Sequence, residues 1–402
     1  MRVAVVSFHT SPLAQPGTGD GGGMNVYVRR LSSELARGGL ECDVFTRTWR
    51  PGLDPAVELE PGLRVHHIAA GPTANVAKED LAGLVDAFTE GVGDRFDLEG
   101  PPDVIHANYW LSGVAGHALK HRFDVPLVCT FHTLGRVKAE VDSDEGEQRA
   151  RAEAQVVGCS DAILASSADE AHQLERHYAA VPHRIEVVAP GVDHHTFFPG
   201  DRGAARRQLG LGDDPVLLFV GRIQPLKGAD IAVRALAALR RPATLVVVGG
   251  PSGPEGEETV AGLRQLVQNL GLSGRVRFVE PQVHVDLAPY YRSADVCLVP
   301  SRSESFGLVA LEAAACGTPV VAAAVGGLRQ LVVPGVTGYL VAGREPEAFA
   351  ERVDALLADP LAAAAMGARA ASGARRYRWS ITAARLRRLY ADLTVRQLVE
   401  CA

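Results

Sequence analysis

Short apolar runs alternate with segments of helical apolar spacing along the first half of the chain. The first run, RVAVVS at residues 2–7, is followed by a glycine-rich loop and by MNVYVRRLSSELARGG, which has helical spacing and a glycine stop. Continuous apolar runs predict strands that are buried on both faces of a parallel sheet. The same alternation continues with six more predicted strands: ECDVFTR, LRVHHIAA, PPDVIHANY, PLVCTFHT, DAILASS and RIEVVAPGV. It predicts an open parallel sheet covered by helices.

A second alternating series begins after residues 188–201, VAPGVDHHTFFPGD, which are rich in Pro, Gly and Asp and predict a hinge. Its strands are PVLLFVGR, ATLVVVGG, VRFVEP, ADVCLVPS, PVVAAAVGG and GYLV. We therefore expect an α/β chain of two doubly wound, Rossmann-like domains, residues 1–193 and 194–376, facing each other across a substrate cleft. The last segment, about residues 377–402, predicts an amphipathic helix that packs on the first domain through Trp379, Leu386 and Tyr390.

Composition narrows the class of protein. The chain has 402 residues and a net charge of −6, which argues against a nucleic-acid partner. It has no apolar run long enough to cross a membrane and no signal peptide at its start, so we expect a soluble cytoplasmic protein. The cysteines are scattered, without metal-binding spacing, and predict small core residues and no disulfide. They are Cys42, Cys129, Cys159, Cys297, Cys316 and Cys401.

The stretch from residue 298 to 327 carries two carboxylates close to a predicted helix start. LVP ends a strand, SRSES forms a loop, and GLVALEAAA is a helix whose first turn is predicted to include Ser305, Phe306 and Gly307. The free N–H groups of that turn favour a phosphate. Glu304 and Glu312 lie about two turns apart, so both can accept hydrogen bonds from sugar hydroxyls of one ligand. Taken alone, such a pair of glutamates is more often a helix cap, here Glu304, and a solvated helix face, here Glu312.

Two cations follow the first strand of the second domain. Arg222 and Lys227, in GRIQPLKG, are placed to neutralise a diphosphate, the arginine by paired hydrogen bonds and the lysine as a point charge. Their alternative reading is a pair of solvated loop charges. A second glycine-rich loop, residues 17–23, precedes a helix directly after the first strand of the chain and would allow a ligand to approach the backbone closely.

Polar side chains also stand at the predicted carboxyl ends of strands in the first domain. His9 follows the first strand, Asn108 and Tyr109 follow PDVIHA, and His132 and Thr133 follow PLVCTF. A lone histidine is more often structural than catalytic. Because parallel strands end at the same edge, these residues should nevertheless gather at one site.

Taken together, the motifs resemble the retaining glycosyltransferases of family 4, which have the two-domain GT-B fold. The resemblance rests on Glu304-Ser-Phe-Gly-x4-Glu312, Gly317-Thr-Pro-Val, Gly326-Gly327, Gly221-Arg222 and Lys227, and covers nearly the whole chain. It implies an enzyme that takes a sugar from a UDP-sugar, with the first glutamate near the sugar, the second on the ribose and the cations on the diphosphate. The implied donor site is Gln15, Pro16, Gly23, Arg222, Lys227, Gln282, Val283, Glu304, Ser305, Phe306, Gly307, Leu308 and Glu312.

The N-terminal half is similar to one branch of that family, the enzymes that transfer N-acetylglucosamine from UDP-N-acetylglucosamine to 1D-myo-inositol 3-phosphate in mycothiol biosynthesis. The similarity implies that Lys78, Tyr109, Thr133 and Arg149 clamp a phosphate, for which two cations and two hydroxyls are suited. The whole implied acceptor site is His9, Asp20, Gly21, Gly22, Met24, Asn25, Lys78, Tyr109, Thr133 and Arg149. The enzyme class also implies a homodimer.

Retention without an evident carboxylate nucleophile is most simply explained by a front-side displacement, in which the leaving diphosphate helps to deprotonate the acceptor. The implied catalytic set is His132, Arg222, Lys227 and Glu304. No cofactor is required for this chemistry. The resemblance also allows a magnesium ion at Tyr291, Arg292, Ala294 and Thr318.

Several positions depart from the inositol-phosphate branch. Asn108 stands where a histidine is usual, Gln282 where an arginine is expected, Gly135-Arg136 replaces small residues, and the region around Lys138 is shorter. These departures leave open a family 4 transferase with another acceptor, such as a hexose phosphate in the manner of sucrose-phosphate synthases. A sugar-nucleotide-binding protein without activity and a phosphorylase with pyridoxal phosphate on a lysine are further alternatives. Against the phosphorylase, the single lysine of the second domain, Lys227, lies in the diphosphate loop.

Overall fold

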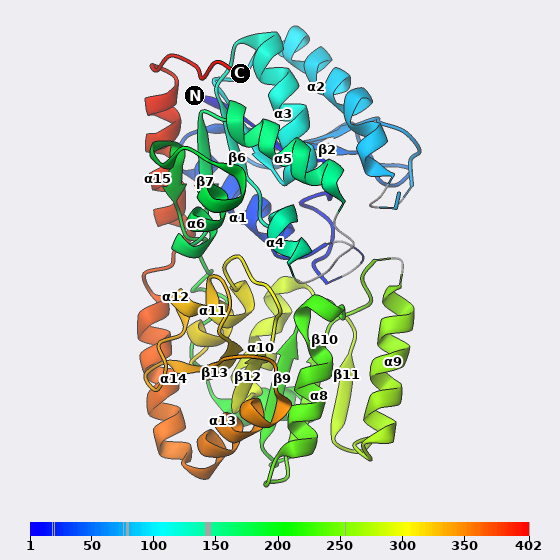
Figure 1. Ribbon diagram of the computed structural model, residues 1–402, viewed down its shortest axis with the longest axis vertical. Coiled ribbons are helices and arrows are strands. Elements are labelled where there is room, and N and C mark those ends of the chain that lie inside the picture. Colours follow the sequence, from blue (N-terminus) through cyan, green and yellow to red (C-terminus); the bar gives the residue numbers. More distant parts are fainter. Residues whose placement is uncertain are drawn as a thin grey trace. The chain divides into compact units, whose positions relative to one another are not determined.

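A computed structural model describes residues 1–17, 19, 21–74, 76–77, 80–140, 146–253 and 255–401 (Figure 1). The chain divides into two compact units, each an α/β unit built around its own sheet. The first comprises Met1–Ala14, Gly23–Gly191 and Trp379–Ala402, and the second comprises Gln15–Gly22 and Val192–Arg378. The expected α/β class with two parallel sheets is confirmed.

The sheet of the first unit has eight strands in the order β3-β4-β2-β1-β5-β6-β7-β8. All neighbours are parallel except β3 and β4. The strands are β1 (Arg2–Val6), β2 (Glu41–Arg47), β3 (Ala56–Glu60), β4 (Leu63–Ile68), β5 (Val104–Asn108), β6 (Leu127–Thr130), β7 (Ala162–Ala165) and β8 (Ile185–Val187). The antiparallel edge strand β3 was not predicted, because its sequence AVELE alternates apolar and charged residues instead of forming an apolar run.

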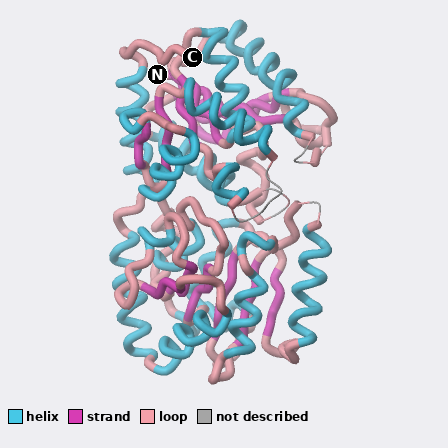
Figure 2. The backbone as a smooth tube through the Cα atoms, viewed as in Figure 1, coloured by secondary structure: helices cyan, strands magenta, loops and turns pink. Residues whose placement is uncertain are grey.

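Helices connect these strands and flank the sheet (Figure 2). Their bounds are α1 (Gly23–Arg37), α2 (Val85–Glu99), α3 (Trp110–Phe123), α4 (Gly135–Ala139), α5 (Glu147–Cys159) and α6 (Ala168–Tyr178), with short 3-10 turns at Leu81–Leu84 and Pro182–Arg184. The core packs aromatic and aliphatic side chains from strands and helices together. Phe8 and Phe88, for example, are both almost fully buried with their ring centroids 4.8 Å apart.

The last helix, α15 (Trp379–Leu393), belongs to the first unit although the preceding helices belong to the second (Figure 1). It packs against α1, and Trp379, Leu386 and Tyr390 are buried as predicted. The Tyr390 hydroxyl lies 2.7 Å from Nδ1 of His106, a fully buried residue of β5. Apolar burial and this hydrogen bond together hold the helix on the sheet.

The second unit has a sheet of six parallel strands in the order β11-β10-β9-β12-β13-β14. They are β9 (Val216–Val220), β10 (Thr244–Val248), β11 (Val276–Val279), β12 (Val296–Val299), β13 (Val320–Ala323) and β14 (Gly338–Val341). Its helices are α7 (Arg202–Leu209), α8 (Ala229–Ala238), α9 (Gly256–Asn269), α10 (Ala288–Ser293), α11 (Leu308–Ala315), α12 (Leu328–Leu331), α13 (Pro346–Ala358) and α14 (Pro360–Ala374), with 3-10 turns at Pro225–Lys227 and His284–Leu287. No helix in the described part of the chain could span a membrane.

The cysteines fall into two groups. Four are free and buried, as predicted: Cys42, Cys129, Cys297 and Cys316. The expectation of no disulfide is wrong, because Cys159 and Cys401 are joined in one despite a sequence separation of 242 residues. Their spacing along the chain does not indicate this pairing, since it depends on how the C-terminal segment folds back onto α3 and α5.

Candidate active site

Most of the predicted donor residues lie in the second unit, near the carboxyl edge of its sheet, where the strand order reverses. Gly23 is the exception, because it begins α1 of the first unit. Strands β10 and β11 are added in turn on one side of β9, and β12 then pairs with the other side of β9. Such a switch point is where doubly wound sheets bind ligands. The loop after β9 carries Arg222 and Lys227, and the loop after β12 carries Glu304.

Lys227 and Glu304 meet across this switch point. The Lys227 ammonium lies 2.6 Å from Oε2 of Glu304, and the Ser301 hydroxyl donates to the same oxygen. Both charged side chains are partly exposed, at 29% and 17%. Lys227, predicted for the diphosphate, and Glu304, predicted for the sugar, therefore form an ion pair with each other. Because both are partly exposed, each could leave this pair to bind a group of the ligand.

Glycines fix the position of the Glu304 loop. A Cβ on Gly326 would lie 1.9 Å from the Glu304 carbonyl oxygen, and the Gly327 N–H donates to that carbonyl at 3.0 Å. Gly307 has a φ of 103°, a conformation that a side chain disfavours. The predicted helix start is corrected by one turn: α11 begins at Leu308, so Ser305, Phe306 and Gly307 precede the helix instead of forming its first turn.

Glu312 lies on α11 and is buried, with both carboxylate oxygens engaged by the protein. Oε1 lies 2.7 Å from Nε2 of His284, and Oε2 accepts a hydrogen bond of 2.7 Å from the Tyr291 hydroxyl. His284 was not predicted at all, and Tyr291 was predicted only as a contact of a magnesium ion. Burial and the negative charge of Glu312 raise the pKa of Tyr291, so the phenol stays a donor. The carboxylate is thus held in one orientation, with lone pairs left on each oxygen for a further donor.

Arg222 and the loop before Gly23 lie in the same unit. Arg222 donates to the Ser252 hydroxyl at 3.0 Å, and a Cβ on Gly22 would lie 3.5 Å from Nε of Arg222. The Gln15 amide donates to the Pro281 carbonyl at 2.9 Å, next to the predicted base contacts Gln282 and Val283. Val283 is half-exposed, and Gln282 donates to the Glu280 carbonyl. The remaining predicted donor contacts, Pro16 and Leu308, are both partly buried.

The residues predicted for magnesium lie together but offer mainly neutral groups that are already hydrogen bonded. The Tyr291 carbonyl accepts from the Thr318 hydroxyl at 2.6 Å and from the Ala294 N–H at 3.3 Å. The Arg292 guanidinium donates to the carbonyls of Thr196 and Phe198. Magnesium requires octahedral oxygen ligands, commonly with a carboxylate, so these four residues do not fit the ion as they stand.

The first unit has a matching switch point between β1 and β5. His9 follows β1 and Tyr109 follows β5, and their rings lie 4.9 Å apart, so they bridge that point. Tyr109 has a φ of 76°, and His132, after the neighbouring strand β6, has a φ of 61°. Left-handed backbone at residues other than glycine costs about 1–3 kcal/mol and is concentrated at functional sites. No local sequence pattern indicates this strain.

Three of the four predicted phosphate ligands are in contact. The Arg149 guanidinium donates to the Thr133 carbonyl and hydroxyl at 2.8 and 3.1 Å, and it lies 5.0 Å from the centre of the Tyr109 ring. Arg149 is also paired with Glu153, one turn later on α5, at 2.8 Å. Glu153 is fully buried and also accepts hydrogen bonds from the Gly135 N–H and the Tyr178 hydroxyl. It was not predicted, although an acidic residue four positions after an arginine on a helix is a recognisable pair.

His132 is held by Asn108. The Asn108 amide nitrogen faces the His106 carbonyl, so its oxygen faces Nε2 of His132 at 2.9 Å and assigns the proton to that nitrogen. Burial, reinforced by the nearby His106, lowers the pKa of His132 from 6.5 to about 3. The imidazole is therefore neutral at physiological pH. It can orient a substrate by hydrogen bonding but carries no positive charge.

The other predicted acceptor residues are placed less directly. Asn25 is buried and hydrogen bonded to Thr10 and Ser11, so it holds the loop after β1. Gly21 is buried, and Gly22 and Met24 are partly buried. Gly23, which was predicted for the donor, is exposed at the start of α1. Asp20 and Lys78 lie outside the described residues.

Comparison with known proteins identifies the family of the chain. A family model described as a glycosyl transferase 4-like domain matches residues 22–191, and one described as glycosyl transferases group 1 matches residues 201–373. The D-inositol 3-phosphate glycosyltransferase of Actinosynnema mirum is 50% identical over 97% of each chain. The chain therefore belongs to the glycosyltransferase family that these two models describe. D-inositol 3-phosphate glycosyltransferase 2 of Catenulispora acidiphila is 49% identical over 97% of this glycosyltransferase and 94% of its own length.

Solved structures carry the same fold. The sucrose-phosphate synthase of Thermosynechococcus elongatus is 36% identical to this glycosyltransferase, with a TM-score of 0.92 over 98% of each chain. The Anabaena protein HepE, solved with UDP and glucose, has a TM-score of 0.79 over 98% of this chain and all of its own, at 21% identity. The GT-B fold expected from the sequence is thereby confirmed.

Proposed function

We propose that this glycosyltransferase moves N-acetylglucosamine from UDP-N-acetylglucosamine to 1D-myo-inositol 3-phosphate with retention of configuration, the first step of mycothiol biosynthesis. The observation that carries the proposal is the contact of Arg149, Thr133 and Tyr109 at the carboxyl edge of the first sheet. A guanidinium and two hydroxyls suit a phosphate monoester. Relatives about 50% identical that bear the corresponding name support the choice of inositol phosphate.

In the proposed donor complex, the leaving diphosphate replaces Glu304 as the partner of Lys227. Glu304 then accepts hydrogen bonds from the transferred sugar, and Glu312 from the ribose. Arg222 and Lys227 stabilise the charge that develops on the leaving group, which is the largest contribution a site of this kind can make. The complex of HepE with UDP and glucose supports a UDP-sugar as the donor for this fold.

In the proposed transfer step, the acceptor hydroxyl attacks on the face from which the diphosphate leaves, and its proton passes to a diphosphate oxygen. His132 is neutral and hydrogen bonded to Asn108, so it serves to orient the sugar and not as the acid. No step uses a metal ion.

A second candidate acceptor is a hexose phosphate, favoured by the 36% identity to a sucrose-phosphate synthase. The deciding experiment measures UDP release from UDP-N-acetylglucosamine with 1D-myo-inositol 3-phosphate, free myo-inositol or fructose 6-phosphate. Of the three acceptors, we expect only 1D-myo-inositol 3-phosphate to support turnover. Turnover with fructose 6-phosphate and none with inositol phosphate would reject the proposed acceptor while leaving the donor chemistry in place.

A further inference from the structure

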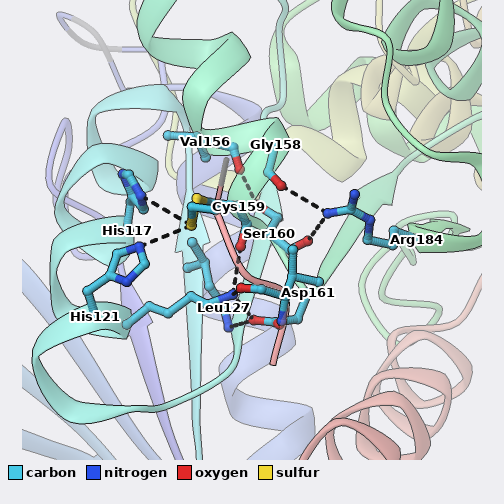
Figure 3. Close-up of a disulfide and its surroundings, with 12 residues drawn as sticks. His117, His121, Leu127, Val156, Gly158, Cys159, Ser160, Asp161 and Arg184 are labelled. Atoms are coloured by element: carbon cyan, nitrogen blue, oxygen red, sulfur yellow. Dashed lines mark hydrogen bonds and ion pairs between the residues drawn. A yellow bond between two sulfur atoms is a disulfide. The ribbon is translucent and has the colours of Figure 1, made fainter. Parts of the chain in front are cut away.

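Two histidines and two cysteines converge in the first unit (Figure 3). They lie at the C-terminal ends of α3 and α5, whereas Tyr109 and Arg149 lie at the N-terminal ends of these helices. His117 and His121 are four residues apart on α3 and so lie on one face. Cys159 is the last residue of α5, and Cys401 belongs to the C-terminal segment. One ligand atom from each of the four lies within 4.8 Å of all the others.

Both imidazoles approach the Cys401 sulfur. Nε2 of His121 lies 3.0 Å and Nε2 of His117 lies 3.7 Å from Cys401 Sγ. A disulfide sulfur is only a weak acceptor and gives no reason for two imidazole nitrogens to converge on it. Two thiolates and two imidazoles are instead the donor set of structural zinc, and His-x3-His is a zinc-ligand spacing.

A buried ion pair holds the chain next to Cys401 in place, so the position of Cys401 beside the two histidines does not depend on a bond between the sulfurs. Lys120 and Asp161 are 2.8 Å apart with side chains 2% and 3% exposed. Lys120 also donates to the Val399 carbonyl at 3.0 Å, and the Val399 N–H donates to Asp161 at 2.7 Å. The main chain two residues before Cys401 is thus fixed by hydrogen bonds, so the four ligands are preorganised.

We propose that, in the reduced chain, His117, His121, Cys159 and Cys401 bind one zinc ion. A dithiol reductant supplies the two electrons and two protons that convert the Cys159–Cys401 disulfide into two thiols, and is itself oxidised to a disulfide. Zinc then displaces the two thiol protons to solvent and binds both thiolates and both neutral imidazoles. His121 is exposed, which gives the ion a route to the site.

The bound ion ties the C-terminal segment to α3 and α5 and takes no part in sugar transfer. Arg149 and Cys159 are ten residues apart on α5, about 15 Å along the helix axis. The two sites therefore occupy opposite ends of the same helices, and loss of the metal should leave the transferase reaction largely intact.

The test uses the full chain without an affinity tag, reduced with a dithiol, separated from the reductant without air and mixed with zinc chloride or cobalt chloride. We expect one zinc per chain after gel filtration. Cobalt should give the intense visible bands of a tetrahedral ion and near-ultraviolet charge-transfer bands from thiolate. Cys401→Ala and His121→Ala should each weaken binding at least about 100-fold, since even outer-shell changes cost 10–100-fold.

Matched controls are His172→Ala, an exposed histidine of α6, and Cys42→Ala, a free buried cysteine, both of which should bind zinc as the original chain does. A reduced chain that binds no zinc, or a Cys401→Ala chain that keeps the thiolate-to-cobalt bands, would overturn the proposal. Because His121 is on the surface, its variant should fold even where a cysteine variant does not, and UDP release by each variant reports on folding separately.

Discussion

Single residues at the two switch points have partners that define how they can act. The sequence predicts Lys227 as a cation for the diphosphate, and in the structure it forms an ion pair with Glu304 while remaining partly exposed, so it can exchange this partner for a ligand. Arg149, by contrast, is locked to a fully buried carboxylate and has little freedom to move. We therefore expect the first residue to contribute mainly to the transition state and the second to substrate binding.

Replacing Lys227 with alanine should lower kcat more than tenfold, a loss of at least about 1.4 kcal/mol of transition-state stabilisation. The reason is that the diphosphate loses its point charge as it leaves. The measurement is UDP release at saturating donor and acceptor. Lys138→Ala is the control, because this lysine has no part in the proposed donor site, and equal turnover of both variants would remove Lys227 from the proposed mechanism.

Arg149→Lys should raise the KM for the phosphorylated acceptor about tenfold or more, with little change in the KM for the UDP-sugar. Lysine keeps the charge but loses the forked geometry that holds Thr133 and a phosphate together. Arg151→Lys, an exposed arginine two residues later on the same helix, is the matched control. A neutral acceptor whose KM rises equally would contradict the assignment of Arg149 to a phosphate.

At the scale of elements, the parallel strands were predictable from the sequence, whereas contacts between distant segments were not. Buried parallel strands require apolar runs, so each such strand among the described residues was predicted from the sequence, whereas the edge strand β3 was missed. The donor residues were identified by a motif with fixed spacing. Glu153, the left-handed backbone of Tyr109 and His132, and the Cys159–Cys401 pairing all depend on contacts between distant segments, which no local pattern encodes.

The importance of the close contact between Gly326 and the Glu304 loop can be measured by comparison with Gly343, a glycine that also has a positive φ but has no close neighbours. Gly326→Ala should destabilise the protein by at least about 2 kcal/mol more than Gly343→Ala and should abolish transfer, since its Cβ would lie 1.9 Å from a carbonyl oxygen. Gly343 also has a positive φ but nothing within 4 Å. Urea unfolding measures both, and equal losses would show that strain alone governs Gly326.

At the scale of the whole molecule, buried titratable side chains shape the response of stability to acid. Burial alone would raise the pKa of Asp43, but hydrogen bonds from His66 and Arg2 and the charge of Arg64 outweigh it and hold that pKa well below its usual range. Burial lowers the pKa of His106 and of His132 from 6.5 to about 3. In all three cases the unfolded chain binds the proton more readily, so acid favours unfolding.

Stability should therefore be complete above about pH 6.5, fall as the pH drops from 6.5 toward 3 because of the two histidines, and fall further below about pH 4 because of Asp43. Each histidine alone contributes a loss on the order of 2 kcal/mol at about pH 5. Urea midpoints between about pH 7.5 and 4.5 measure this slope. His106→Gln should flatten it, and an unchanged slope in that variant would locate the acid sensitivity elsewhere.

The left-handed backbone at Tyr109 and His132 also bears on directed evolution. Glycine at either position would remove the conformational penalty but would also remove an aromatic ring. At residue 132 it would remove the hydrogen bond to Asn108 as well. A library screened for heat resistance alone has no need of the His132 imidazole beyond its packing, whereas one screened for turnover must retain it. The divergence of the two libraries at these codons would measure how much foldability this chain gives up for its chemistry.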